Sequence, residues 1–107
     1  MMTLEDFKAA RKVLDGVLHR TDLMYSPFFS KTTGNNIYIK PENMQVTGAY
    51  KIRGAYFKCS TLTDEEKARG LVTASAGNHA QGVAYAAQAA GVKATIVMPT
   101  TTPLVKV

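Results

Sequence analysis

The chain of 107 residues has one cysteine, no tryptophan and no long apolar run. Cys59 has no partner for an internal disulfide, and no cluster of Cys and His has metal-ligand spacing, so we expect the cytoplasm and no metal site. Glu5 and Asp6 stand where a signal peptide would carry basic residues. No apolar stretch approaches the roughly 20 residues that cross a bilayer, so no membrane partner is expected.

The net charge of +5 does not follow the pattern of a nucleic-acid-binding protein. The basic residues are dispersed among acidic ones, without a basic block or a basic stripe that alternates with aromatic residues. Solvated faces and one anionic ligand account for the positive excess. We therefore expect no nucleic-acid partner; the alternative, a basic nucleic-acid binder, predicts a steep salt dependence of binding.

The apolar share of 46% and the charged share of 20% are typical of one ordinary globular domain. Apolar periodicity and capping residues predict helices alternating with strands. Helices are expected over residues 4–16, 52–60, 64–69 and 80–90, and strands over residues 37–40, 71–74 and 94–98. The packed face of the last helix is predicted to consist of Ala80, Val83, Ala84 and Ala87. The fold class is therefore α/β, an open parallel sheet with flanking helices.

Two other segments carry further expectations. Residues 19–35 are predicted to form a loop with at most a short helix around residues 27–30. Residues 103–107 resemble the start of another helix, at a point where a parallel sheet should continue. We expect the chain to be a fragment of a longer protein.

Lys51 lies in the glycine-flanked run Gly48-Ala49-Tyr50-Lys51-Ile52-Arg53-Gly54. A lysine that forms a Schiff base needs desolvation or nearby positive potential to lower its pKa, and a helix that starts at Lys51 supplies some of that potential. Tyr50 could present its ring face to a flat heteroaromatic group or pack in the core. From this spacing alone, a solvated structural lysine stays open as the alternative.

A second polar run, Ser75-Ala76-Gly77-Asn78-His79-Ala80-Gln81-Gly82, joins a predicted strand to a predicted helix. The Ser75 hydroxyl, the Asn78 amide and the free N–H groups of the first helical turn are expected to meet at the carboxyl end of the strand. Such a turn can hold a carboxylate or a phosphate. The structural alternative is a plain turn with Ser75 as N-cap, Gly77 at the bend and a structural His79. A Schiff-base lysine and an anion-binding turn belong together in pyridoxal phosphate chemistry.

The two runs together resemble the threonine dehydratase (threonine ammonia-lyase) and serine dehydratase branch of the fold-type II pyridoxal phosphate enzymes. The resemblance extends over nearly the whole chain and is carried by Lys40-Pro41-Glu42-Asn43-Met44-Gln45-Val46-Thr47-Gly48-Ala49-Tyr50-Lys51-Ile52-Arg53-Gly54-Ala55 and by the Ser75 to Gly82 run. It implies a tryptophan synthase β-like subunit with two domains. Residues 1–45 would belong to the larger domain and residues 46–107 would form most of the small α/β domain, with the remainder absent.

The resemblance also implies roles for individual residues. Lys51 would bind pyridoxal 5'-phosphate as a Schiff base and act with Ser75 as a catalytic residue. Tyr50 would pack against the cofactor ring, where the family usually has phenylalanine, and Asn78 would hydrogen-bond the phenolic oxygen of the ring. The residues that would cradle the carboxylate of the amino-acid substrate are Ser75, Gly77, Asn78 and His79.

The implied activity is dehydration and deamination of L-threonine and L-serine to a 2-oxo acid and ammonia, a reaction of amino-acid metabolism that includes isoleucine biosynthesis. The fragment itself is expected to be inactive, because the family's glycine-rich phosphate loop lies beyond Val107. The parent is expected to be a homo-oligomer. Serine racemase is the nearest alternative, although Ala76 replaces the serine that racemases tend to use as a second proton donor. A non-catalytic anion-binding module is the alternative from another class.

Overall fold

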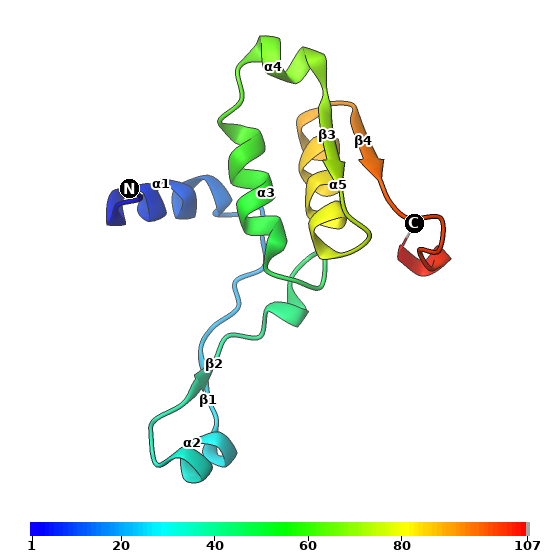
Figure 1. Cartoon of the computed structure of the whole chain (residues 1–107). Coiled ribbons are helices and arrows are strands. Elements are labelled where there is room, and N and C mark those ends of the chain that lie inside the picture. The colour runs from blue at the N-terminus through cyan, green and yellow to red at the C-terminus, as the bar shows by residue number, and fades with distance from the viewer. Residues whose placement is uncertain (107) are drawn as a thin grey trace.

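The computed structural model describes residues 1–106, which form a mixed α/β structure with a protruding hairpin (Figure 1). In chain order the elements are α1 (Leu4–Leu14), β1 (Met24–Tyr25), α2 (Pro27–Thr33), β2 (Tyr38–Ile39), the 3-10 helix η1 (Glu42–Met44), α3 (Lys51–Ser60), α4 (Asp64–Arg69), β3 (Leu71–Ala74), α5 (Asn78–Ala90), β4 (Ala94–Val97) and the 3-10 helix η2 (Leu104–Lys106). Within residues 1–106, no helix is long and apolar enough to cross a membrane.

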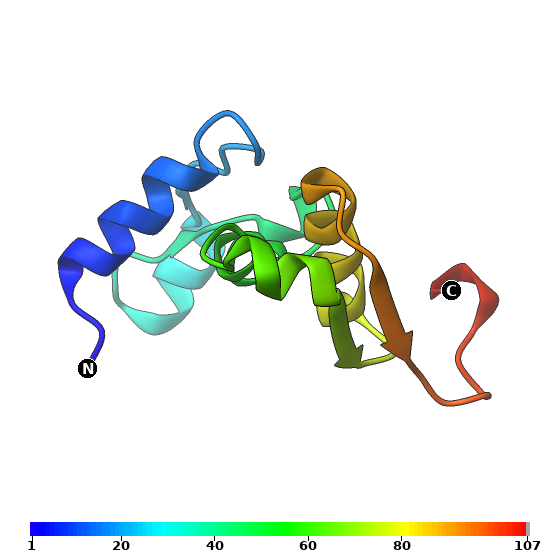
Figure 2. The ribbon, with the colours of Figure 1, turned by 90° about the horizontal axis from the view of Figure 1, so that it is seen from above.

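The first helix begins with a capping box. The Thr3 side chain accepts a hydrogen bond from the Asp6 N–H, and the Asp6 carboxylate accepts one from the Thr3 N–H at 2.7 Å. The backbone N–H groups of Thr3 and Asp6, which have no acceptor within the helix, are both satisfied in this way. Every residue of α1 is exposed or half-buried, and the helix extends away from α5 (Figure 2).

Residues 19–35 hold more structure than the predicted loop. The two-residue strands β1 and β2 pair antiparallel, with Met24 opposite Ile39 and Tyr25 opposite Tyr38. Helix α2 follows β1, begins at the Ser26 N-cap and closes at Gly34, whose φ of 69° is the left-handed conformation that favours glycine. This hairpin projects from the rest of the molecule (Figure 1). The short helix expected around residues 27–30 is therefore longer than predicted, and the strand expected over 37–40 is shorter.

The predicted parallel β-α-β unit is confirmed. Strands β3 and β4 pair in parallel from Leu71 opposite Ala94 to Ala74 opposite Val97, and α5 connects them. Half-buried and exposed residues alternate along both strands, as expected for a sheet covered on one face by a helix. Both carboxyl ends lie at one edge of this sheet, as parallel pairing requires.

The core lies between α3 and α5, which run side by side (Figures 1 and 2). On α3 the buried side chains are Ile52 and Cys59. On α5 the buried residues are Ala80, Gly82, Ala86 and Ala87, so the predicted face is wrong at Val83 and Ala84, which are only half-buried. Glycine carries no apolar side chain, so the periodicity of apolar residues missed the line of closest approach between the helices.

That closest approach occurs at Gly82. A Cβ placed there would lie 3.3 Å from the Ile52 N, the Ile52 Cα and the Ala55 Cβ. The missing side chain lets α5 rest directly on the backbone of the first turn of α3, which fixes the relative position of the two helices. The last described element is η2, a single 3-10 turn at the position where the sequence predicts the start of another helix; Val107 lies outside the described residues.

Candidate functional site

Lys51 is the first residue of α3, and the prediction that it lies at a helix start is confirmed. Its side chain is exposed, and no carboxylate in the described part of the chain pairs with it. The Lys51 Nζ lies 5.5 Å from the centre of the Tyr50 ring. The ring is itself 61% exposed, so the interpretation of Tyr50 as a core residue is wrong. An amine and an aromatic face thus stand together at one open helix end.

The turn before Lys51 is tight. The Gly48 N–H donates to the Gln45 carbonyl at 2.7 Å, and Gly48 has a φ of 68°. A residue with a side chain would be strained in that conformation, which explains the glycine. The neighbouring Thr47 hydroxyl is buried and has no hydrogen-bond partner among the residues that the structure describes.

The second predicted run forms the turn between β3 and α5. The Ser75 N–H donates to the Val97 carbonyl at 3.0 Å and so continues the pairing of the sheet. The Ser75 hydroxyl accepts from the Gly77 N–H at 3.3 Å. Gly77, not Ser75, is the N-cap of α5, so the expectation of Ser75 as N-cap is wrong. Since the backbone of Ser75 still belongs to the sheet, the helix starts only after Gly77.

The first turn of α5 leaves donors free. Asn78 and His79 are its first two residues, and both are exposed. The N–H groups of Asn78, His79 and Ala80 have no acceptor among residues 1–106, because the first helical hydrogen bond runs from Gln81 to the Gly77 carbonyl. A Cβ at Gly77 would meet nothing within 4 Å. Free N–H groups at a helix N-terminus favour a negatively charged group.

The packing of α3 on α5 brings the two predicted runs together. Both helices start at the same end of the pair (Figure 1), and the contact of Ile52 with Gly82 joins the first turn of α3 to the second turn of α5. The other three α-helices are closed by side chains of their own N-caps, Thr3, Ser26 and Thr63. In the structure of residues 1–106, α3 and α5 have no such cap. The uncapped helix ends therefore coincide with the predicted site.

A polar cluster beside this site was missed by the sequence analysis. The Arg53 guanidinium donates from Nε to the Glu42 Oε2 at 2.9 Å and from Nη2 to the Glu42 Oε1 at 2.7 Å. The buried Thr21 donates its hydroxyl to the Glu42 carboxylate. The Arg53 hydrogen bond is the largest cause that lowers the pKa of Glu42 to about 2. Glu42 and Arg53 are 11 positions apart, so neither a helical nor a strand period predicts their contact. Both residues lie in the run that carries the family resemblance.

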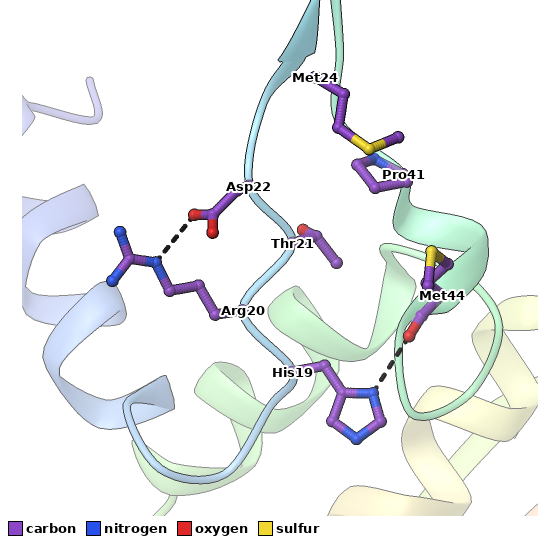
Figure 3. A pocket seen from close by; sticks show the side chains of 7 residues that line it. All are labelled: His19, Arg20, Thr21, Asp22, Met24, Pro41 and Met44. Atoms are coloured by element: carbon purple, nitrogen blue, oxygen red, sulfur yellow. Dashed lines mark hydrogen bonds and ion pairs between the residues drawn. The ribbon is translucent and has the colours of Figure 1, made fainter.

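The side chain of Gln45, which follows η1, binds the backbone of the segment after α1. Its side-chain oxygen accepts from the His19 N–H at 2.9 Å, and its side-chain nitrogen donates to the His19 carbonyl at 3.0 Å. The His19 Nδ1 lies 3.1 Å from the Met44 carbonyl (Figure 3). The pairing with a backbone N–H and carbonyl explains why Gln45, though polar, is only 4% exposed.

Two hollows of the structure are lined by residues other than the predicted site residues. One, of about 500 Å³, is lined by His19, Arg20, Thr21, Asp22, Met24, Pro41 and Met44 (Figure 3). A second, of about 860 Å³, lies between α1 and α3. Neither includes Lys51, Ser75 or Asn78. The candidate site is defined by its donor groups at the starts of α3 and α5.

The donor set fits an anionic aldehyde cofactor with an aromatic ring. Lys51 offers an accessible amine, Tyr50 an exposed ring, and α5 a group of unpaired N–H donors beside the open space at Gly77. Such an α/β fold, with free N–H donors at the carboxyl edge of a parallel sheet, is typical of a cofactor-binding class of enzyme domain.

The comparison with known families identifies that class. The family model described as "Pyridoxal-phosphate dependent enzyme" matches residues 14–107, so the chain belongs to this family. The family resemblance and the cofactor, pyridoxal phosphate, are thereby confirmed.

Two curated relatives match along the whole chain. An L-threonine ammonia-lyase of Thermotoga maritima is 59% identical over 107 residues, which are 100% of this chain and 27% of the relative. An L-threonine dehydratase catabolic TdcB of Staphylococcus aureus is 48% identical over 99% of this chain and 31% of the relative. The chain thus spans less than a third of the length of these relatives.

Solved structures agree with the fold class. The serine racemase of Dictyostelium discoideum superposes with a TM-score of 0.90 at 38% identity, over 98% of this chain and 34% of the racemase. The threonine deaminase isoform 2 of Solanum lycopersicum superposes with a TM-score of 0.79 at 43% identity, over 99% of this chain and 30% of the deaminase. The predicted α/β class of a fold-type II enzyme is confirmed. The division at residue 45 and the roles of individual residues stay predictions.

Proposed function

We propose that the protein containing this chain dehydrates and deaminates L-threonine, and also L-serine, to a 2-oxo acid and ammonia. The names of the two curated relatives support L-threonine as the substrate, and L-serine follows from the family resemblance. The observation that carries the proposal is the contact of Ile52 with Gly82, because it places Lys51 at the same end of the helix pair as the uncapped turn of α5.

In this proposal Lys51 holds the cofactor and then accepts the proton from the substrate Cα at its Nζ. When bound, pyridoxal phosphate supplies an aldehyde for the lysine and a ring that takes up electron density. Tyr50 would pack against the ring and shield one of its faces from water. Asn78 would donate its side-chain amide to the phenolic oxygen of the ring.

The substrate carboxylate is assigned to the turn between β3 and α5. The free N–H groups of Asn78 and His79, the Ser75 hydroxyl and the open backbone at Gly77 form the proposed cradle. Binding at the start of α5 places the negative charge where the helix dipole stabilises it. Lys51, at the same end of the helix pair, is assigned as the acceptor of the Cα proton.

Racemisation is the second candidate activity, because a serine racemase structure superposes closely on this chain. A racemase needs a second proton donor on the face of the ring opposite the lysine. Ala76 has no acid–base group, and this favours elimination. Measuring both D-serine and 2-oxo acid formed from L-serine separates the two activities.

The test of the proposed function is the rate of 2-oxo acid and ammonia formation from L-threonine by the full-length protein with pyridoxal phosphate. We expect equimolar products from the unaltered protein and no detectable turnover by Lys51→Ala. Conversion of L-serine to D-serine without ammonia would instead support the racemase. Binding of the cofactor without either reaction would support a non-catalytic anion-binding module.

Three further expectations accompany this function. We infer that residues 1–45 belong to the larger domain and residues 46–107 to the small domain of the subunit. The buried, unpaired thiol of Cys59 fits a reducing location such as the cytoplasm. The full-length protein is expected to form a homo-oligomer, which gel filtration tests. Limited proteolysis of the same protein tests the domain boundary.

A further inference from the structure

Three successive residues at the start of α3 have three different surroundings. Lys51 is exposed, Ile52 has no exposed surface and lies against Gly82, and Arg53 reaches Glu42. Successive residues of an α-helix are about 100° apart around its axis, since a turn takes 3.6 residues. Holding the side chains of Ile52 and Arg53 therefore fixes the rotation of the first turn. Because the rotation of this turn is fixed, the direction in which the Lys51 side chain leaves the helix is fixed as well.

The contact of Arg53 is well suited to this role. Two hydrogen bonds, at 2.9 and 2.7 Å, join the guanidinium to both oxygens of the Glu42 carboxylate, and Nη2 also donates to the Thr21 hydroxyl at 3.3 Å. Glu42 and Arg53 keep only 16% and 32% of their side chains exposed, so solvent screens the pair weakly. A planar fork on a carboxylate sets an orientation, which a single ammonium contact cannot do.

We name the three residues Thr21, Glu42 and Arg53 the Arg53 cluster. Thr21 follows α1, Glu42 begins η1, and Arg53 is the third residue of α3. The Lys40 Nζ lies 4.0 Å from the Glu42 Oε1 and adds a second positive charge to the carboxylate. The cluster therefore connects the segment before residue 45 to the turn of α3 that carries Lys51.

We propose that Arg53 is a positioning residue, whose fork on Glu42 sets the direction of the Lys51 amine. The inference rests on the proposed function, in which Lys51 holds the cofactor and accepts the Cα proton. A displacement of about 1 Å at a reacting group can lower a rate on the order of 100-fold, so a modest rotation of α3 would be sufficient to affect the reaction. A pair that served stability alone would leave Lys51 unaffected in the folded protein.

The test is Arg53→Lys in the full-length protein, because lysine keeps the charge and loses the fork. The matched control is Arg69→Lys, since Arg69 makes an exposed pair with Glu65 at 3.9 Å on α4. Two quantities are measured: the rate at which borohydride traps pyridoxal phosphate on Lys51, found by peptide mapping, and kcat and KM for L-threonine. We expect Arg53→Lys to lower the trapping rate and kcat on the order of 10- to 100-fold, with little change in KM. Arg69→Lys should change none of these quantities.

Circular dichroism melting shows whether each variant is folded at the assay temperature. If Arg53→Lys is unfolded, Glu42→Gln replaces it, because it keeps the shape of the acceptor and removes its charge; the same losses are expected. A folded variant that traps the cofactor and turns over like Arg69→Lys would overturn the positioning role and leave the proposed function standing. Loss of the fold in both variants would assign the cluster to stability alone. If the unaltered protein shows neither trapping on Lys51 nor turnover, the proposed function fails and the inference fails with it.

Discussion

Replacing Gly82 by alanine tests whether the contact between α3 and α5 controls the site. The added Cβ would lie 3.3 Å from the Ile52 N and Cα, which are backbone atoms of a helix and cannot rotate away as a side chain would. Such a contact is closer than ordinary van der Waals packing, so α3 must move by a few tenths of an ångström. Overpacking of this kind costs about 1–3 kcal/mol. Alanine also gains about 1 kcal/mol of helix propensity over glycine, which offsets part of the cost.

The chain offers a matched control in Gly54, which lies in the interior of α3 with no atom within 4 Å of an added Cβ. Gly54→Ala gains the same propensity without the clash, so it should raise the free energy of unfolding by about 1 kcal/mol. The two variants should therefore differ by about 1–3 kcal/mol, the overpacking cost alone. Urea unfolding gives both values, and borohydride trapping on Lys51 should be reduced in Gly82→Ala only. Equal stability of the two variants would refute the packing argument.

Three other substitutions test separate parts of the structure. Hydrogen bonding to Arg53 lowers the pKa of Glu42 to about 2, below its ordinary value of 4.5. The ionised Glu42 carboxylate therefore contributes fully to stability above about pH 5, and this contribution is lost as the pH falls toward 2. In urea unfolding, the difference in free energy of unfolding between the unaltered protein and Glu42→Gln should close over that pH range. Thr47→Val removes a buried hydroxyl without a partner in the described residues, and should leave the melting temperature unchanged or raise it, whereas a clear decrease would show that the hydroxyl is satisfied. Gly70→Ala should destabilise by more than about 1 kcal/mol in the same assay, because Gly70 has a φ of 82° and an added Cβ would lie 2.9 Å from the Lys93 carbonyl oxygen.

Local rules predicted several helix ends, although not the start of α5. Residues 64–69 form the predicted helix, which begins at a capping box of Thr63 and Glu66 and closes at Gly70, and the helix predicted over residues 80–90 closes at Gly91. These features depend on residues within four positions of each other, which a sequence displays directly. The parallel unit of β3, α5 and β4 was predicted for the same reason, since each element has its own apolar pattern.

Contacts between distant segments were not predictable in this way. Arg53 with Glu42, and Gln45 with the backbone of His19, join residues whose spacing follows neither a helical nor a strand period. The close contact at Gly82 was missed because glycine contributes nothing to an apolar pattern, although its small size is what the packing requires. The glycines around Lys51 and the predicted helix start singled out this residue, and the family resemblance, not the spacing, implied its role in cofactor binding.

The central claim is that Lys51 is the amine that binds the cofactor. The most direct test is borohydride reduction of the full-length protein with pyridoxal phosphate, followed by peptide mapping of every lysine, with Lys51→Ala as the control. Exposed lysines also form transient Schiff bases, so selectivity decides the result. We predict one pyridoxyl group concentrated on Lys51 and its loss in Lys51→Ala. Labelling spread evenly over the lysines, or unchanged by Lys51→Ala, would contradict it.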